Sequence, residues 1–159
     1  MIRGLETYVE IWNERAQQTL VALHGFTGST ATWRNLAKAL PHIRVIAIDC
    51  IGHGQTAVPE EISRFSMDEQ IQDLEEVISQ LRLEQFTLLG YSMGGRIALS
   101  YAIAYPERIK RLILESASPG LRTSQERSER CVRDNELAEK NNLQWITIIR
   151  QCMGEHPFV

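Results

Sequence analysis

Residues 86–104 read FTLLGYSMGGRIALSYAIA, and they carry the strongest indication of the fold in this sequence. Residues 86–89 form a short apolar run, which is typical of a strand buried on both faces of a sheet. Residues 97–104 are apolar nearly all round, which predicts a helix covered by the sheet and its neighbours. Between them, Gly90-Tyr91-Ser92-Met93-Gly94 must carry the chain from strand to helix. A turn this tight favours residues without side chains, and it raises the Ser92 hydroxyl above the end of the sheet.

Strand-like and helix-like segments alternate on both sides of this stretch. Short apolar runs predict strands, and apolar residues at helical spacing predict helices. The predicted strands cover residues 19–23, 45–48, 86–89 and 109–114, with a half-exposed edge strand at 7–11, and further helices are predicted at 33–40 and 67–81. Because parallel strands need crossover connections, this order predicts an α/β fold with a mostly parallel sheet and helices on both faces.

Two further segments carry local signals. Ser66 and Glu69 have the spacing of a capping box, so we expect a helix to begin there. After Gly120 the sequence becomes rich in Arg, Glu and Ser and has few apolar anchors. We therefore expect an α/β core over residues 1–120 and the start of a helical lid over residues 121–159.

Composition limits the class of protein. The chain has 159 residues, of which 43% are hydrophobic and 23% charged, with a formal net charge of −3. This is enough for one core, and the charge argues against nucleic acid or an anionic membrane as the main partner. No apolar run approaches the roughly 20 residues of a membrane span, and the first residues do not resemble a signal peptide.

The three cysteines, Cys50, Cys131 and Cys152, are widely spaced and have no histidine at a metal-ligand spacing. We interpret them as buried or incidental thiols in a reducing compartment. We therefore expect a cytoplasmic protein without a metal site.

The loop after the first buried strand, residues 24–28 (HGFTG), is the second element of a catalytic site. If the turn at Ser92 holds a nucleophile, this loop supplies one N–H group of an oxyanion hole, and the residue after the nucleophile supplies the other. The sequence thus predicts the Phe26 and Met93 amides in that role. The helix that begins after Ser92 points its positive dipole end at the same place.

Three other polar residues near these loops have a structural interpretation. His24 precedes the serine and lies in the oxyanion loop, so we favour a histidine that orders the loop by bonding to backbone. His53 lies between two glycines and is interpreted in the same way. Asp49 ends a predicted strand, where it more readily orders the following turn than acts as a base.

Arg96 is the most informative single residue, because it follows Ser92 by one helical turn in an otherwise apolar helix. An arginine in such surroundings is costly unless it is paired with an anion. One interpretation is a salt bridge, for example to Glu115. The other, which we favour, is a clamp for a substrate carboxylate beside the nucleophile.

Two segments resemble a known family within the α/β-hydrolase fold. Residues 90–96 (GYSMGGR) and 115–121 (ESASPGL), the latter followed by Arg127 and Arg130, resemble 2-succinyl-6-hydroxy-2,4-cyclohexadiene-1-carboxylate synthase of menaquinone biosynthesis. Residues 24–28 and 52–54 (GHG) fit this family but are shared with many hydrolases. The resemblance covers about residues 1–140.

The resemblance implies a carbon–oxygen lyase that eliminates pyruvate from a succinyl-cyclohexene dicarboxylate, with no metal or organic cofactor. It implies that Ser92, activated by a histidine, removes a proton next to a carbonyl. It also implies that Arg96 and Arg130 bind the carboxylates of a small polycarboxylate substrate, with Tyr91 in the pocket. For Arg130, a solvated helix face remains a second interpretation, and the oligomeric state is left open.

The sequence does not complete this site. A serine of this fold is followed along the chain by an acid and then a histidine, and only His156 follows Ser92. We therefore expect a truncated family member that is inactive alone. Back-translation of residues 153–159, read one base later, spells an aromatic segment like the expected lid, so we hypothesise a frame slip between Lys140 and Met153.

Truncation would leave residues 109–114 as an exposed apolar edge, which predicts aggregation. Two functional alternatives stay open. One is a carboxylic-ester hydrolase, whose pocket would be apolar and would not depend on Arg96. The other is a non-catalytic remnant.

Overall fold

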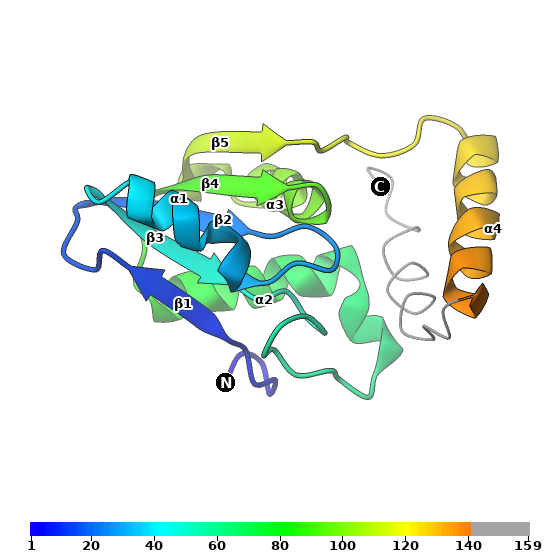
Figure 1. Ribbon diagram of the computed structural model, residues 1–159, viewed down its shortest axis with the longest axis horizontal. Coiled ribbons are helices and arrows are strands. Elements are labelled where there is room, and N and C mark those ends of the chain that lie inside the picture. The colour runs from blue at the N-terminus through cyan, green and yellow to red at the C-terminus, as the bar shows by residue number, and fades with distance from the viewer. Residues whose placement is uncertain (141–159) are drawn as a thin grey trace.

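The computed structural model describes the backbone of residues 1–140, which form a five-stranded sheet flanked by helices (Figure 1). The hypothesised frame slip and His156 lie outside the described residues. In chain order the elements are β1 (Val9–Trp12), β2 (Gln18–Leu23), η1 (Thr30–Trp33), α1 (Arg34–Ala39), β3 (Ile43–Ile48), η2 (Ile62–Phe65), α2 (Met67–Gln80), β4 (Phe86–Tyr91), α3 (Met93–Ala104), η3 (Pro106–Arg108), β5 (Ile109–Glu115) and α4 (Ser124–Lys140).

The sheet has the strand order β1-β3-β2-β4-β5, and all its neighbouring pairs except β1 and β3 are parallel. The central strands β2, β3 and β4 are buried over most of their second halves, which fits strands covered on both faces. The predicted mostly parallel sheet is confirmed. The antiparallel direction of β1 was not predicted, because a half-buried edge strand has the same sequence pattern in either direction.

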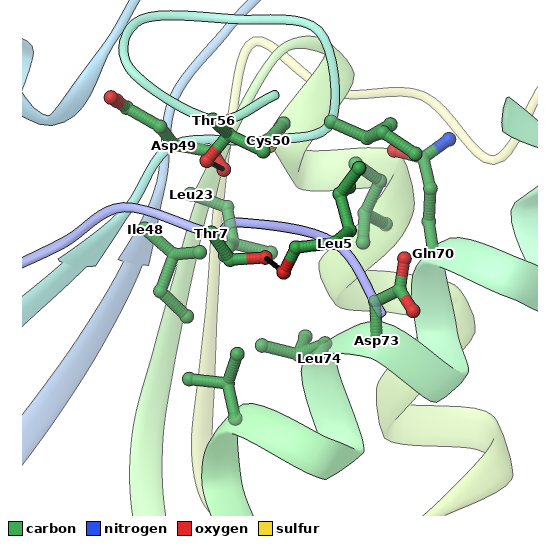
Figure 2. Close-up of a pocket in the computed structure, with 13 residues that line it drawn as sticks. Leu5, Thr7, Leu23, Ile48, Asp49, Cys50, Thr56, Gln70, Asp73 and Leu74 are labelled. Carbon is green, nitrogen blue, oxygen red and sulfur yellow. Dashed lines mark hydrogen bonds between the residues drawn. The ribbon is translucent and has the colours of Figure 1, made fainter. Parts of the chain in front are cut away.

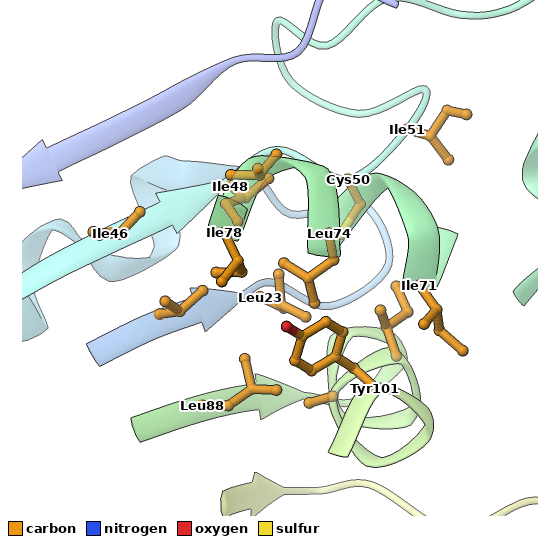
Figure 3. Packing of buried hydrophobic residues seen from close by; sticks show 14 of the residues in the cluster. Leu23, Ile46, Ile48, Cys50, Ile51, Ile71, Leu74, Ile78, Leu88 and Tyr101 are labelled. Atoms are coloured by element: carbon orange, nitrogen blue, oxygen red, sulfur yellow. The ribbon is translucent and has the colours of Figure 1, made fainter. Parts of the chain in front are cut away.

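The two faces of the sheet carry separate cores. On one face, α2 and α3 pack against the strands, and Figure 3 shows Leu74 and Ile78 of α2 and Tyr101 of α3 gathered over Leu23 and Leu88. On the other face, η1 and α1 cover β2 and β3, and Leu89 is the one β4 residue in that cluster. Helices on both faces are therefore confirmed.

Helix α2 begins where the sequence predicted. The Ser66 hydroxyl accepts a hydrogen bond from the Glu69 amide at 3.3 Å, which satisfies one of the free N–H groups of the first turn. The apolar residues at helical spacing within 67–81 form one stripe along the helix. Met67, Ile71, Leu74 and Ile78 of this stripe are buried, and Leu81 is partly buried after the helix ends. Local capping and periodicity thus fix this helix and its orientation.

Helix α3 differs from expectation at its end. The sequence predicted that residues 97–104 would be covered all round, but Ile103 is 57% exposed and Ala104 is also exposed. In the same last turn Tyr101 is fully buried against α2, so Ile103 and Ala104 lie on a side of α3 that the described elements leave uncovered. Strand β5 likewise forms an edge of the described sheet, and aggregation through it stays a prediction.

Helix α4 is mostly exposed along its described side chains, and Figure 1 shows it beyond the carboxyl ends of β4 and β5, apart from the sheet. Thr123 and Glu126 cap its first turn reciprocally, with N–O distances of 3.0 and 3.1 Å. A surface helix over part of residues 121–140 is confirmed, whereas the lid role and the domain division at residue 120 stay predictions. Among the described helices, none has the length and apolar character that crossing a bilayer requires.

Candidate active site

Ser92 forms the turn between β4 and α3. Its backbone has φ 52° and ψ −109°, a positive-φ conformation that costs energy for any residue with a side chain. The turn is held on both sides: the Ser92 amide donates to the Glu115 carbonyl at 2.9 Å, and the Ser92 carbonyl accepts from the Gly95 and Arg96 amides. Ser92 is half-buried, so it lies near the surface at the carboxyl end of β4 and not in the core.

Gly94 allows the first turn of α3 to lie directly on the end of β2. A Cβ atom at Gly94 would overlap the carbonyl oxygens of Leu23 and His24, and the Gly94 amide donates to the His24 carbonyl at 3.1 Å. The glycine is therefore required by close approach and not only by the turn. This contact joins the serine turn to the loop that follows β2.

That loop, residues 24–28, lies against the serine. The Gly28 amide donates to the Gly25 carbonyl at 2.9 Å, which closes a tight turn. A Cβ atom placed on Gly25 would stand 3.4 Å from Cβ of Ser92 and 2.7 Å from the Tyr91 ring. Gly25 and Ser92, which directly precede Phe26 and Met93, are thus neighbours in space. An oxyanion hole formed by the Phe26 and Met93 amides requires this arrangement. The assignment of the two amides remains a prediction.

His24 is fully buried, and backbone groups engage both of its ring nitrogens. Nδ1 lies 2.8 Å from the Gly25 carbonyl and therefore carries the proton, while Nε2 accepts from the Cys50 amide at 3.0 Å. Burial lowers the pKa of the ring, which keeps it neutral. His24 is a loop-ordering residue, as predicted, and it links the ends of β2 and β3.

His53 and Asp49 also order loops. The His53 Nδ1 lies 3.0 Å from the Ile51 carbonyl, and burial lowers the pKa of this ring as well. The Asp49 carboxylate accepts from the Thr30 amide at 2.6 Å and from the Gln55 amide at 2.8 Å. These contacts confirm the structural interpretation of both residues.

The remaining predicted site residues lie at or beyond the same edge of the sheet. Tyr91 ends β4, is 39% exposed, and packs its ring over Gly25. Arg96 is half-buried in the first turn of α3, and Arg130 is exposed on α4. The structure thus brings Tyr91 and Ser92 against the 24–28 loop and places Arg96 one turn away. Substrate roles for Tyr91, Arg96 and Arg130 stay predictions.

The histidines in the part of the chain that the structure describes are His24, His42 and His53. His24 and His53 are buried and bonded to backbone. His42 immediately precedes β3, at the amino edge of the parallel strands, and the carboxyl edge that carries Ser92 is the opposite one. The absence of a histidine base for Ser92 stays a prediction.

The main-chain role of Glu115 was not predicted from the sequence. The predicted ion pair between the Arg96 and Glu115 side chains stays a prediction, and the structure shows in addition that the Glu115 carbonyl accepts a hydrogen bond from the Ser92 amide. No side-chain pattern signals such a contact, because any residue at that position offers the same carbonyl group.

A separate small cavity of about 40 Å³ lies under the N-terminal segment (Figure 2). Leu5 and Thr7 line it from above and Leu74 of α2 from below, and Ser92 is not among its lining residues. It has room for no more than a few water molecules. Within residues 1–140, no three His, Cys, Asp or Glu residues gather as metal ligands would.

Comparison with known proteins agrees with this geometry. Residues 18–138 match the family model described as alpha/beta hydrolase fold, so the chain belongs to the α/β-hydrolase-fold family. A solved mutant epoxide hydrolase from Bacillus megaterium superposes with a TM-score of 0.78 at 21% identity, over 91% of this chain and 54% of that one. This likeness shows the fold alone.

Two relatives with higher sequence identity share one enzyme name. A Bacillus subtilis (strain 168) protein, provisionally named 2-succinyl-6-hydroxy-2,4-cyclohexadiene-1-carboxylate synthase, is 51% identical over 124 residues, which are 78% of this chain and 45% of that protein. The enzyme of that name from Enterobacter sp. (strain 638) is 36% identical over 121 residues, 76% of this chain and 46% of that protein. The chain thus resembles these synthases and spans about half the length of the curated relatives it matches.

Proposed function

We propose that this chain is the nucleophile-bearing part of a lyase that eliminates pyruvate from a succinyl-cyclohexene dicarboxylate. The observation that carries the proposal is the strained Ser92 turn, packed against the 24–28 loop, in a chain 51% identical to a relative named as such a synthase. The shape of the site fits many hydrolases, so the relatives' names supply the substrate class.

In the proposed reaction, the Ser92 oxygen takes a proton from the carbon next to a carbonyl. The electron pair of that C–H bond forms a new double bond, the carbon–oxygen bond to the leaving group breaks, and the leaving group departs as the enolate of pyruvate. The enolate takes up one proton to give pyruvate, which balances the proton removed from the carbon. The Phe26 and Met93 amides would stabilise the negative oxygen that develops on the carbonyl. Such an enzyme needs no metal or organic cofactor for these steps.

Arg96, Arg130 and Tyr91 would bind the substrate. Two carboxylates require cationic partners, and guanidinium groups bind carboxylates with paired hydrogen bonds. Arg96 is well placed because it is half-buried one helical turn after Ser92. Arg130 lies on α4, beyond the edge of the sheet that carries Ser92, so α4 would have to approach that edge for Arg130 to bind.

A serine hydroxyl is a poor base without an adjacent histidine. We propose that none of the described histidines activates Ser92, so that the 159-residue chain binds substrate but does not turn it over. We also propose a cytoplasmic location, since the buried free thiol of Cys50 is typical of a reducing compartment.

Equilibrium binding of the dicarboxylate substrate, measured by calorimetry, tests the Arg96 role. Arg96→Ala should weaken binding about tenfold or more, because a hydrogen bond to a charged group contributes roughly 1.5–3 kcal/mol. Arg82→Ala is the control, because Arg82 is exposed on the turn before β4, at the opposite edge of the sheet. Equal binding by wild type and Arg96→Ala would reject the lyase proposal.

Pyruvate release and the reactivity of Ser92 test whether the chain lacks turnover. We expect no pyruvate release above that of Ser92→Ala, and little labelling of Ser92 by a phosphonate. The pocket of an ester hydrolase would instead bind its substrate with an affinity that does not depend on Arg96. Measurable synthase turnover by the purified chain would contradict the proposed lack of a base.

A further inference from the structure

The two predicted oxyanion donors follow β2 and β4 at matching positions. These strands run parallel, and their carboxyl ends lie on the same side of the sheet (Figure 1). In their register Leu23 pairs with Gly90, and Gly25 and Ser92 each follow by two residues. Each of these two residues directly precedes one of the predicted donor amides. The sheet register therefore brings the two donor peptide groups to one place.

The direction of an amide N–H follows from the carbonyl group of the same peptide. In a trans peptide the C=O of one residue and the N–H of the next lie in one plane and point in opposite directions. Every peptide bond between residues 1 and 140 is trans. The Gly25 carbonyl thus sets the direction of the Phe26 N–H, and the Ser92 carbonyl sets that of the Met93 N–H.

Both of these carbonyl groups accept two hydrogen bonds. The Ser92 carbonyl accepts from two amides of the first turn of α3, at 3.1 and 3.2 Å. The Gly25 carbonyl accepts from the Gly28 amide at 2.9 Å and from Nδ1 of the His24 ring at 2.8 Å. Three of these four donors are main-chain amides, and the fourth is a side chain. The Phe26 peptide group therefore depends on the His24 ring for its orientation.

The His24 ring is itself held in one position. It is fully buried, and its Nε2 accepts from the Cys50 amide at 3.0 Å, just after β3. A neutral ring serves both contacts only when its proton is on Nδ1. The ring thus connects the Gly25 carbonyl rigidly to the end of β3.

The main chain of His24 contacts the second donor as well. Its carbonyl accepts from the amide of Gly94, the residue after Met93, at 3.1 Å. The ring of His24 thus orients the peptide of one predicted donor, and its carbonyl holds the turn that contains the other. A single residue lies between the two halves of the predicted oxyanion hole.

We infer that His24 is a positioning residue of the oxyanion hole, whose Nδ1–H group holds the Gly25 carbonyl and thereby directs the Phe26 N–H. This inference rests on the proposed role of the Phe26 amide. It assigns the effect to one ring nitrogen, whereas Nε2 serves to fix the ring. A donor that is oriented before the substrate binds needs no reorganisation when negative charge develops on the carbonyl oxygen.

Two conservative variants separate the roles of the two ring nitrogens. In His24→Asn the side-chain N–H group takes the place of Nδ1 and can donate to the Gly25 carbonyl, but nothing accepts from the Cys50 amide. In His24→Gln the side-chain oxygen reaches the place of Nε2 and can accept from the Cys50 amide, but no donor lies near the Gly25 carbonyl. Each variant removes one hydrogen bond and keeps the other.

Residual dipolar couplings of the purified chain measure the direction of each backbone N–H bond. We expect the wild-type coupling at Phe26 in His24→Asn and a changed or lost coupling in His24→Gln. The Met93 coupling should stay the same in both variants, because the Ser92 carbonyl keeps its two donors. His42→Gln, at an exposed position, is the control and should leave both couplings unchanged.

Two results of this experiment would overturn the inference. A wild-type Phe26 coupling in His24→Gln would mean that the ring does not orient the peptide group. The same change in His24→Asn and His24→Gln would mean that loss of the ring loosens the loop in general, whichever nitrogen is replaced.

A measurement on the wild-type chain does not depend on the folding of any variant. Nitrogen chemical shifts of the His24 ring identify the atom that carries the proton, and we expect Nδ1. A proton on Nε2 would contradict donation to the Gly25 carbonyl and would reject the inference.

Calorimetry with the dicarboxylate substrate tests the positioning role and the proposed function separately. His24→Gln should bind the substrate about fivefold more weakly than His24→Asn, as expected for the loss of one hydrogen bond to a neutral carbonyl. Equal affinities of these two variants would reject the role of His24 in the oxyanion hole. A wild-type chain that does not bind the substrate would reject the proposed function, and the couplings would still decide whether His24 orients the Phe26 N–H.

Discussion

At the scale of single residues, the serine turn depends on backbone contacts from neighbouring strands. The Ser92 amide is held by β5 through Glu115, and the first turn of α3 is held on β2 through Gly94 and His24. A positive φ at a non-glycine residue costs roughly 1–2 kcal/mol, and these contacts offset it. The turn is therefore a product of the surrounding sheet and not of its own five residues.

Replacing Gly94 by alanine should disrupt this arrangement. The new Cβ would overlap two carbonyl oxygens, so we expect a loss of about 2–3 kcal/mol in the free energy of unfolding, measured with urea. Gly4→Ala is the control: Gly4 has φ 85° but no atom within 4 Å of its Cβ position, so only about 1 kcal/mol of backbone strain is expected. Equal losses in the two variants would show that close approach at Gly94 is unimportant.

At the scale of elements, one polar cluster fixes α2, α3 and η3 to one another. The fully buried Tyr101 of α3 donates its hydroxyl to Glu75 of α2, and Glu75 also pairs with Arg108 of η3 at 2.6 Å. Burial is the main reason that the pKa of Tyr101 is raised, so the hydroxyl stays protonated and remains a donor. The cluster therefore sets the position of α3 and the serine turn at its start.

We expect Tyr101→Phe to destabilise the chain by about 1.5–3 kcal/mol, the range for a hydrogen bond to a charged group. Tyr105→Phe is a matched control, because its ring lies 5.0 Å from that of Tyr101 and the same atom is removed. Its effect should stay within about 0.5 kcal/mol. Urea unfolding of both variants measures the difference, and similar values for the two would contradict a special role of the Tyr101–Glu75 bond.

At the scale of the whole molecule, two buried histidines make stability depend on pH. Burial lowers the pKa of both His24 and His53 below the ordinary value of 6.5. As the pH falls below about 6.5, the unfolded chain binds protons that the folded chain does not, so stability is lost. Each histidine contributes a slope of up to about 1.4 kcal/mol per pH unit, down to its own folded pKa.

Unfolding free energies at pH 7.5, 6.5 and 5.5 measure this slope. His24→Asn keeps a donor near the Gly25 carbonyl but cannot titrate, so it should lower stability at pH 7.5 and flatten the slope by about half. His53→Asn should flatten it in the same way. His42→Gln, at an exposed position, is the control. A slope that is the same in wild type and both buried variants would contradict the role given to these rings.

Local sequence patterns were enough to predict the elements and their order. Strands such as β2 and β4 are apolar runs, and α2 combines the Ser66 cap with an apolar stripe, so local patterning and crossover geometry were sufficient to predict the sheet. The serine turn and the backbone role of His24 were also predictable, because glycines and short loops restrict what a chain can do there. These are consequences of local chemistry.

The contacts between distant segments could not be predicted from local patterns, because they form only in the folded chain. The hydrogen bond from the Ser92 amide to the Glu115 carbonyl, the direction of β1 and the exposure of Ile103 all depend on which segments become neighbours. Main-chain groups are the same at every residue, so no sequence pattern indicates which carbonyl an amide will find. The packing of the strands determines which groups pair, and in this way it forms the candidate site.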